Sequence, residues 1–336
     1  MSGALSDRER SSVVIVHGVI DASRPDEQDT LDQVRDVAAV LARTGHSVET
    51  LALSLDLTPL ASIAKDAIVF NLVEALAGNG RLIHLAPAVI EHLGLVFTGS
   101  GSAALAITTD KVLTKRLLRV AGIPTPAGPD EPRSTDSDAR FIVKSNSEDA
   151  SFGIDAGSVV AAAQVEAALA DRARRFGGEW FAEEFIDGRE FNLSILEDED
   201  GALQVLPIAE ITFEGFAPGR PRIVDYEAKW EQDSFAYNNT PRRFMADGED
   251  AALADTLRRL ALASWRELGL SGYGRVDFRV DRLNRCYVLE ANANPCLAPD
   301  AGFAAAALAA GISYDRLIAR ILARARHHIP STSDTR

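Results

Sequence analysis

Cysteine, lysine and long apolar runs are all scarce in this chain of 336 residues. Its two cysteines, Cys286 and Cys296, form no CxxC pair, which argues against both a disulfide framework and a zinc site. Apolar stretches such as residues 304–310 fall far short of the roughly 20 residues that a membrane span needs. Residues 1–12 are polar and charged, unlike a secretory signal. We therefore expect a cytoplasmic protein without a membrane partner.

Positive charge is also in short supply, because 35 Lys and Arg stand against 49 Asp and Glu and leave a net charge of −14. Such a surface repels phosphate backbones on average, so nucleic acid is not an expected partner. The only lysines are Lys65, Lys111, Lys115, Lys144 and Lys229. Since arginine fills the other cationic positions, these lysines are candidates for compact point charges beside phosphate groups. Composition alone leaves open that they are scattered at random.

The chain otherwise has the composition of a globular protein, with 46% hydrophobic residues. Short apolar runs alternate with helical periodicity over about 100 residues, which predicts an α/β fold with an N-terminal doubly wound domain. The expected strands are residues 13–16, 48–53, 67–72 and 95–97. Helices are expected from residue 31 to a cap at Gly45, over 82–93 and over 103–122, and a polar loop over 17–29.

The rest of the chain predicts two α+β units. The first has strands at residues 140–144, 158–160 and 180–185 and an Ala-rich helix at 161–176. The second has strands at 191–197 and 203–211, an irregular stretch at 212–248, a helix at 250–268 and a hairpin of 274–280 with 285–293. We accordingly divide the chain into an N-terminal α/β domain (1–110), a central subdomain (111–190), a C-terminal subdomain (191–330) and a disordered tail (331–336).

The hairpin carries the clearest chemical signal. Side chains alternate faces along a strand, so Arg275 and Asp277 share one face, and so do Glu290 and Asn292. If the strands pair, one face gathers two carboxylates and an amide beside an arginine. Hard oxygen ligands without His or Cys suit Mg²⁺, which takes few protein ligands plus substrate phosphates. The alternative is a solvated face with a cross-strand ion pair.

An ordered set of motifs extends this pattern over nearly the whole chain. The motifs are Thr98-Gly99-Ser100-Gly101, Asp110-Lys111, Ile142-Val143-Lys144, Ala150-Ser151-Phe152-Gly153, Glu183-Glu184-Phe185-Ile186, Gly188-Arg189-Glu190-Phe191, Asp225-Tyr226-Glu227-Ala228-Lys229, Gly274-Arg275-Val276-Asp277 and Glu290-Ala291-Asn292-Ala293-Asn294-Pro295. Each is weak alone, but the series resembles ATP-grasp ligases of the D-alanine–D-alanine ligase type. The resemblance implies the ATP-grasp fold, in which an N-terminal doubly wound domain precedes two α+β subdomains that clamp ATP. It also implies an ADP-forming carboxylate–amine ligase.

The resemblance further implies which residues bind the nucleotide. Lys111 and Lys144 would hold ATP phosphates under a lid formed by residues 147–153. The adenine would lie against Glu183 and the backbone near Phe185 and Ile186, and the ribose against Glu190. The other expected nucleotide contacts are Ser151, Glu184, Lys229 and Leu289.

The resemblance assigns the metal and the catalytic groups as well. Asp277, Glu290 and Asn292 would bind two Mg²⁺ ions, or Mn²⁺ in their place, that bridge the β- and γ-phosphates. Arg275 would stabilise the tetrahedral intermediate. Lys229 would reach the transferring phosphoryl group or a substrate carboxylate, and Ser151 is a further catalytic candidate. Glu27 would hold the amino group of the first substrate, with Asp29 as a rival to Glu27.

The acceptor half departs from the pattern of that family. Ala301, preceded by Asp300, stands where a serine would grip the second substrate's carboxylate. Glu74 lies in a loop where a His-Gly segment is usual, and Trp230 stands where tyrosine is common. Cys296 is expected to be a packing residue, since the mechanism needs no nucleophilic thiol.

These departures predict an amino acid, amine or peptide substrate other than D-alanine. Two alternatives stay open: a true D-alanine–D-alanine ligase and a non-catalytic ATP-binding regulator. The expected partners are small-molecule substrates, and a homodimer is left open.

Overall fold

The N-terminal part of the chain is built on a parallel sheet. The structure, a computed structural model, describes residues 11–20, 25–129, 131, 139–198 and 200–326. The strands are β1 (Ser12–Gly18), β2 (Ser47–Leu53), β3 (Ile68–Asn71) and β4 (Val96–Phe97), in the order β2-β1-β3-β4. All residues of β1 after Ser12 are buried, as its β-branched run predicts for a central parallel strand.

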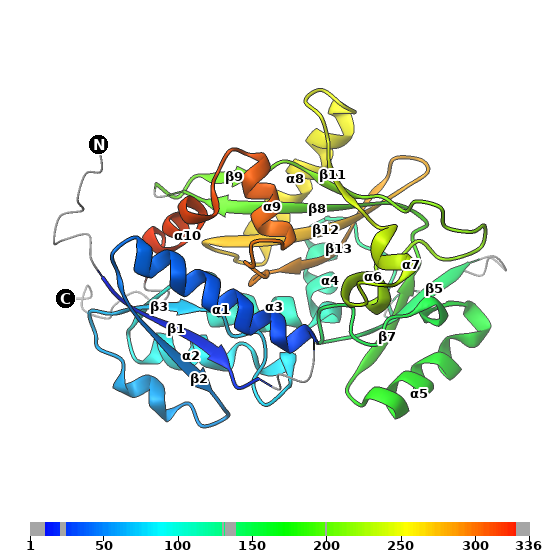
Figure 1. Cartoon of the computed structure of the whole chain (residues 1–336). Helices are drawn as coiled ribbons and strands as arrows, with labels where there is room; N and C mark the ends of the chain where they lie inside the picture. The colour runs from blue at the N-terminus through cyan, green and yellow to red at the C-terminus, as the bar shows by residue number, and fades with distance from the viewer. Residues whose placement is uncertain (1–10, 21–24, 130, 132–138, 199, 327–336) are drawn as a thin grey trace.

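Helices cover both faces of this sheet (Figure 1). On one face, α1 (Pro25–Arg43) and α10 (Tyr314–Ala323) share a core with Val13 and Ile15. On the other face, α2 (Leu85–His92) packs with Val14 and Val16. This arrangement confirms the doubly wound α/β prediction. The loop predicted to run to Asp29 is shorter than expected, because α1 begins at Pro25, whose fixed φ suits the first turn of a helix.

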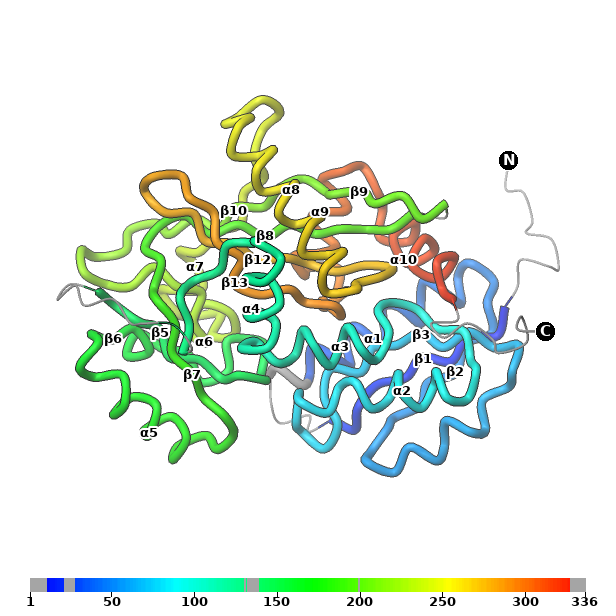
Figure 2. The backbone as a smooth tube through the Cα atoms, turned by 180° about the vertical axis from the view of Figure 1, so that it is seen from behind, coloured from blue at the N-terminus to red at the C-terminus, as the bar shows by residue number. Residues whose placement is uncertain are grey.

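The helix predicted over residues 103–122 is two helices, α3 (Ser102–Thr109) and α4 (Lys111–Val120). Asp110 between them has an extended backbone, and its side chain accepts a hydrogen bond from the Leu113 N–H, so it caps α4. From behind, α3 and α4 are seen to lead from the N-terminal sheet towards the rest of the molecule (Figure 2). The break places Lys111 in the first turn of α4.

The central part is a three-stranded antiparallel sheet with one covering helix. Its strands are β5 (Arg140–Ser145), β6 (Val159–Ala161) and β7 (Trp180–Glu184), in the order β6-β5-β7. α5 (Val165–Phe176) packs on it through a small core that includes Phe141, Val143 and Ala182. The short 3₁₀ helices of the chain are η1 (Thr58–Ser62), η2 (Gly80–Leu82), η3 (Ala156–Ser158) and η4 (Ala162–Gln164).

The C-terminal part is a larger antiparallel sheet. Its strands are β8 (Gly188–Glu197), β9 (Leu203–Val205), β10 (Ala209–Ile211), β11 (Arg242–Phe244), β12 (Tyr273–Asp281) and β13 (Cys286–Asn292). The order is β11-β10-β8-β12-β13, and β9 also pairs with β8. The single strand predicted over residues 203–211 is two strands, β9 and β10. β9 pairs with β8 at Ile195, and β10 pairs with β8 at Asn192.

The stretch predicted to be irregular, residues 212–248, contains short elements. They are α6 (Tyr226–Trp230), α7 (Phe235–Asn238) and β11. Elements of three to five residues are too short to produce a readable hydrophobic period, which explains why the sequence did not reveal them.

The two faces of the large sheet are covered differently, by α8 (Ala251–Glu267) on one face and by α9 (Gly302–Ala309) at Tyr273 on the other. α8 packs on the face that carries Val276, Phe278 and Val288. The helix α9 follows β13. Its Phe303 belongs to the core that contains residues of α1. Figure 1 shows β8, β12 and β13 crossing the molecule above both the N-terminal and the central sheets.

Two surface features bear on the expected partners. In the part of the chain that the structure describes, no helix is both long and apolar enough to cross a bilayer.

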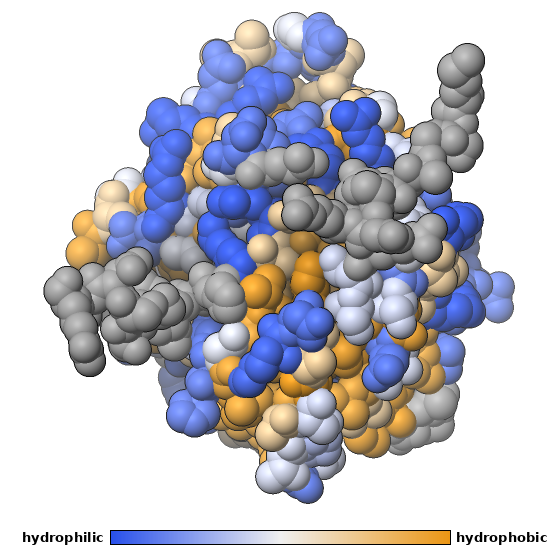
Figure 3. Space-filling view, turned by 90° about the vertical axis from the view of Figure 1, so that its left-hand side faces the viewer, coloured by the Kyte–Doolittle hydropathy of each residue, from blue (hydrophilic) through white to orange (hydrophobic). Residues whose placement is uncertain are grey.

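Apolar side chains gather on the lower half of the face at the left of Figure 1 (Figure 3). The outermost strand of the N-terminal sheet, β2, is exposed at Ser47, Glu49, Thr50 and Ala52. A homodimer stays a prediction.

Candidate active site

The predicted hairpin forms and brings its polar residues together. β12 and β13 pair antiparallel, with Arg275 opposite Asn292 and Asp277 opposite Glu290. The Arg275 guanidinium donates to both oxygens of Asp277, from Nε and Nη2, at 2.8 Å each. Asn192 on β8 donates a third bond to Asp277, also at 2.8 Å. Asp277 is thereby held in one orientation at the centre of the sheet.

Glu290 differs from Asp277 in having only a distant partner. Within the described residues its carboxylate pairs only with the Lys111 Nζ, at 3.9 Å. Burial pushes its pKa up, but the charges of Lys111, Lys144 and Arg275 outweigh burial and lower the pKa to about 2. Burial raises the pKa of Asp277 against the opposing effect of Arg275.

This donor set fits a hard divalent cation. A permanently ionised Glu290 with open oxygens, the Asp277 carboxylate and the Asn292 amide oxygen offer oxygen ligands from adjacent strands. In the described part of the chain, no three His, Cys, Asp or Glu side chains cluster as a metal site. The predicted ligands are instead two carboxylates and an amide, a set that leaves room for phosphate oxygens.

Lys111 connects this ribbon to the lid. Its ammonium group donates to the Asp149 carboxylate at 2.7 Å and to the Glu148 carbonyl at 3.0 Å. Burial lowers its pKa, but the charges of Asp149 and Glu290 reverse the effect and raise it. The buried ammonium is therefore charged.

Among the lysines singled out by composition, Lys115 is the one whose buried ion pair the motifs did not predict. Lys115 lies one turn after Lys111, is almost fully buried, and pairs with Glu183 at 2.7 Å while donating to the Leu289 carbonyl at 2.6 Å. Lys144 pairs with the other Glu183 oxygen at 2.5 Å. Burial would raise the pKa of Glu183, but the two ammonium groups hold it low. The i, i+4 spacing from Lys111 was the available signal.

The predicted adenine and ribose contacts lie together at the far end of the central sheet. Phe185 and Ile186 are buried at the end of β7, and the Phe185 N–H donates to the Arg140 carbonyl. The Glu184 N–H donates to the Ala127 carbonyl. Glu190 pairs with Arg279 at 3.0 Å, an arginine that the sequence reasoning also missed. Arg279 shares the face of Arg275 and Asp277, so strand alternation was its signal.

The lid is held in a strained conformation by bonds to the C-terminal part. Ala150 and Ser151 both have left-handed backbones, with φ of 59° and 60°. The Ser151 Oγ donates to the Val224 carbonyl at 2.8 Å, and the Trp230 indole N–H donates to the Ala150 carbonyl at 3.0 Å. The Lys229 ammonium lies 5.6 Å from the Trp230 ring centroid. These bonds join residues 150–151 to the segment that contains α6.

The opposite end of the cleft is acidic. Thr30 and Gln33 each donate to one oxygen of Glu74, at 3.1 Å, and burial raises the pKa of Glu74 to about 7. The Cys296 thiol donates to Asp29 at 3.2 Å. Burial and the charges of Glu74 and Asp29 raise the pKa of Cys296, so its thiol is inert at neutral pH. Glu27 lies in α1, but its side chain is outside the described residues.

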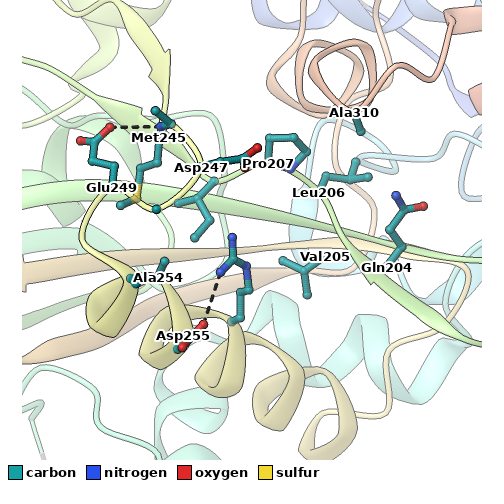
Figure 4. Close-up of a pocket in the computed structure, with 15 residues that line it drawn as sticks. Gln204, Val205, Leu206, Pro207, Met245, Asp247, Glu249, Ala254, Asp255 and Ala310 are labelled. Carbon is teal, nitrogen blue, oxygen red and sulfur yellow. Dashed lines mark hydrogen bonds and ion pairs between the residues drawn. The ribbon is translucent and has the colours of Figure 1, made fainter.

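One cavity adjoins the lid and another lies beside α8. The first, of about 780 Å³, opens between Phe152 of the lid, the adjoining Ile154 and Tyr226 of α6. Another of about 310 Å³ lies between the β9–β10 connection and the start of α8 (Figure 4). The second is lined by Ile208 and Ala254, which belong to the core under α8, and by none of the ribbon residues Asp277, Glu290 and Asn292.

Comparison with known proteins identifies the family. The model of the D-ala D-ala ligase C-terminus matches residues 138–323. A D-alanine–D-alanine ligase of Nitrosococcus oceani is 31% identical over 334 residues, which is 96% of either chain. One of Nitrosospira multiformis is 36% identical over 240 residues, 69% of this chain and 72% of the other. An uncharacterized protein, y4sG, of Sinorhizobium fredii is 35% identical over 303 residues and 85% of either chain.

Solved structures agree on the fold. The D-alanine–D-alanine ligase of Bacillus anthracis complexed with ATP superposes with a TM-score of 0.71 at 22% identity, covering 94% of this chain and 97% of that one. The enzyme of Coxiella burnetii gives 0.67 at 17% identity, with 94% of each chain covered. These neighbours confirm the ATP-grasp fold.

Proposed function

The chain belongs to the D-alanine–D-alanine ligase family of ATP-grasp, ADP-forming ligases, and from this premise we propose that it joins an amino acid other than D-alanine to an amine through an acyl phosphate. The observation that carries the proposal is the pairing of Asp277 with Glu290 across β12 and β13, within reach of the Lys111 ammonium. A ribbon of that kind suits a nucleotide triphosphate with its divalent ions.

The chemistry begins with activation of a poor electrophile. A donor carboxylate oxygen attacks the γ-phosphorus of ATP, ADP leaves, and an acyl phosphate remains. Lys111, Lys144 and Lys229 offset the phosphate charge around the attacked group. Mg²⁺ held by Asp277, Glu290 and Asn292 would supply further charge neutralisation and orientation of the phosphates.

Amide formation completes the reaction. The amine attacks the acyl carbon, and phosphate leaves from the tetrahedral intermediate. Arg275, fixed by its two bonds to Asp277, directs its guanidinium at the developing oxyanion. The lid bonds of Ser151 and Trp230 exclude water, which would otherwise hydrolyse the acyl phosphate.

The substrate end supports a substrate other than D-alanine. Ala301, the residue before α9, has no side-chain hydroxyl. It therefore neither caps the helix nor holds an acceptor carboxylate. Asp300 next to it lies close enough to Asp29 to raise the pKa of that group, so the region is acidic. The α-ammonium of a small neutral amino acid can pair with one carboxylate, which leaves the rest of this negative charge without a partner.

D-Alanine–D-alanine ligation itself is the second candidate. It is favoured by the 31% identity to the Nitrosococcus oceani ligase over 96% of either chain. Small-molecule amino acids or amines are the partners under both candidates.

A phosphate-release screen tests the proposal. Pairs of D- and L-amino acids are supplied with Mg-ATP, ADP is measured, and products are identified by mass. We expect release with at least one pair that excludes D-alanine, and Arg275→Ala should lower that rate about 10²–10³-fold. If only D-alanine supports turnover, the proposal is wrong and D-alanine–D-alanine ligation replaces it.

A further inference from the structure

We propose that Arg279 is a positioning residue for the nucleotide, which fixes the Glu190 carboxylate in the place where it recognises the ribose. The inference rests on the proposed function, because it concerns the nucleotide that the ligase reaction consumes. The motif Gly274-Arg275-Val276-Asp277 ends two residues before this arginine, so the sequence assigned it no role.

Arg279 lies at the nucleotide end of the large sheet. It is on β12, directly opposite Glu190 of β8, and on the same pair of strands Asp277 is opposite Asn192. Two residues along a strand span about 7 Å and point their side chains to one face of the sheet. Glu190 and Arg279 therefore lie on the face of the metal ribbon, displaced from it along the strands. A nucleotide whose phosphates meet the ribbon extends its ribose over such a distance.

The guanidinium of Arg279 is fixed from several directions. Its Nη1 donates to the Gly188 carbonyl at 3.0 Å, and its Nη2 donates to the Arg222 carbonyl. Its Cζ lies 5.8 Å from the ring centroid of Phe185 and 5.5 Å from that of Phe213. The residue is only 4% exposed. Because a planar guanidinium donates in set directions, these partners leave Arg279 one orientation.

Glu190 depends on this arginine for its charge and for its position. Its Oε2 lies 3.0 Å from the Arg279 Nη2, and no other ion pair of Glu190 is formed among the described residues. Burial raises the pKa of the Glu190 carboxyl, and the Arg279 charge is the largest effect that opposes burial. Since Oε2 faces the guanidinium, Oε1 is left to accept a hydrogen bond from a ribose hydroxyl.

The partners of Arg279 also connect the large sheet to the central sheet and the lid. Arg222, whose carbonyl accepts from Arg279, is followed by Ile223, which shares a small core with Phe185. The carbonyl of the next residue, Val224, accepts the lid bond described above. Arg279 therefore holds its carboxylate in register with the residues expected at the adenine and with the lid.

Nucleotide binding without turnover tests the inference. ADP is compared with 2′-deoxy-ADP and 3′-deoxy-ADP by calorimetry in the presence of Mg²⁺. We expect the wild type to bind at least one deoxy nucleotide about 10- to 100-fold more weakly than ADP, the value of a hydrogen bond to a charged group. In Arg279→Met this ratio should fall below about threefold, because Glu190 loses both its fixed position and the cation that keeps it ionised.

Further variants separate positioning from general damage. Glu190→Gln should lower the ratio as far as Arg279→Met does, and the double variant should lower it no further. Arg279→Lys keeps a cation beside Glu190 but cannot donate to two carbonyls in set directions, so it should lower the ratio by a smaller factor. It takes the place of Arg279→Met if that variant does not fold. Arg258→Met removes an exposed arginine of α8 and is the matched control, with the wild-type ratio expected.

The outcomes distinguish this inference from the ligase function. If the folded Arg279 variant weakens ADP and both deoxy nucleotides by the same factor, the inference is wrong, because that result assigns the arginine a structural role or a contact with the base. A wild-type ratio near one also overturns it. In both cases ADP still binds and the ligase function stands. Failure of ADP to bind the wild type overturns both proposals.

Discussion

The proposed nucleotide end of the molecule and its proposed substrate end partner their carboxylates in opposite ways. At the nucleotide end, every buried carboxylate discussed above has a cationic partner, as Glu183 does between Lys115 and Lys144. At the substrate end, Glu74 and Asp29 are held by neutral hydroxyl, amide and thiol donors. The nucleotide end also keeps the motifs of the family, whereas the substrate end departs from them at Glu74 and Ala301.

The difference follows from what each end must hold. Triphosphate and its metal ions are the same in every member of a nucleotide-dependent family, so one arrangement of charges serves all of them. Substrates differ in charge and shape, and a site recognises them through a few positioned polar groups. A change in specificity therefore leaves the lysines in place and alters the residues around the donor and acceptor.

The largest effect is expected from Glu290→Ala. Removing the ionised ligand from the ribbon should lower the rate of ADP formation about 10³-fold, since the charge stabilisation supplied at such a site is several kcal/mol. The rate is measured at saturating Mg-ATP. Asp255→Asn, an exposed carboxylate on α8, serves as control and should be fully active. Undiminished turnover in Glu290→Ala would break the assignment of this end to the nucleotide.

Lys115→Met should mainly lower stability. Removal of one cation leaves Glu183 buried with a single partner, which costs about 3–5 kcal/mol. We expect the melting temperature to fall by about 5–10 °C in calorimetry. Lys115→Met combined with Glu183→Gln should recover part of the loss. Lys65→Met removes an exposed lysine that donates to the Leu93 carbonyl, and it should cost no more than about 1 kcal/mol. A double variant no more stable than the single one would contradict the charge-pairing account.

Ser151→Ala and Trp230→Phe each remove one bond that closes the lid. Each should raise the phosphate released per amide formed about fivefold, because a hydrogen bond contributes about 1 kcal/mol and a looser lid admits water. The ratio is obtained by measuring phosphate and product in the same reaction. An unchanged ratio in both variants would show that the lid does not protect the intermediate.

The smallest effect concerns pH at the substrate end. Glu74 gains a proton on folding, since its pKa rises from 4.5 to about 7, so its contribution to stability is present below pH 4.5 and is lost as pH rises through 7. Wild type should therefore lose a few degrees of melting temperature relative to Glu74→Gln between pH 5 and 8. If the melting temperatures of the two proteins change with pH in the same way, Glu74 is ionised over the whole pH range, which contradicts this prediction.

Patterns along the chain were enough to predict the hairpin. The alternation of Arg275, Val276 and Asp277 fixes which side chains share a face, and the turn at Asp281 brings the next strand alongside it. The pairing of β12 with β8 on its other edge was not predicted. The doubly wound N-terminal domain was predicted for the same reason, because buried strands and amphipathic helices leave a local period. The break at Asp110 was missed, since a capping aspartate inside a periodic run looks like an exposed helical residue.

The amino-acid sequence by itself determined the family, the ATP-grasp fold and the oxygen-rich ribbon of Asp277, Glu290 and Asn292, because motifs and strand alternation are local. Only the tertiary structure decided that Lys115 shares Glu183 with Lys144, and that Gln33 of α1 joins Glu74 to Leu297. These contacts link positions far apart along the chain. They depend on how the three sheets pack, which no local pattern records.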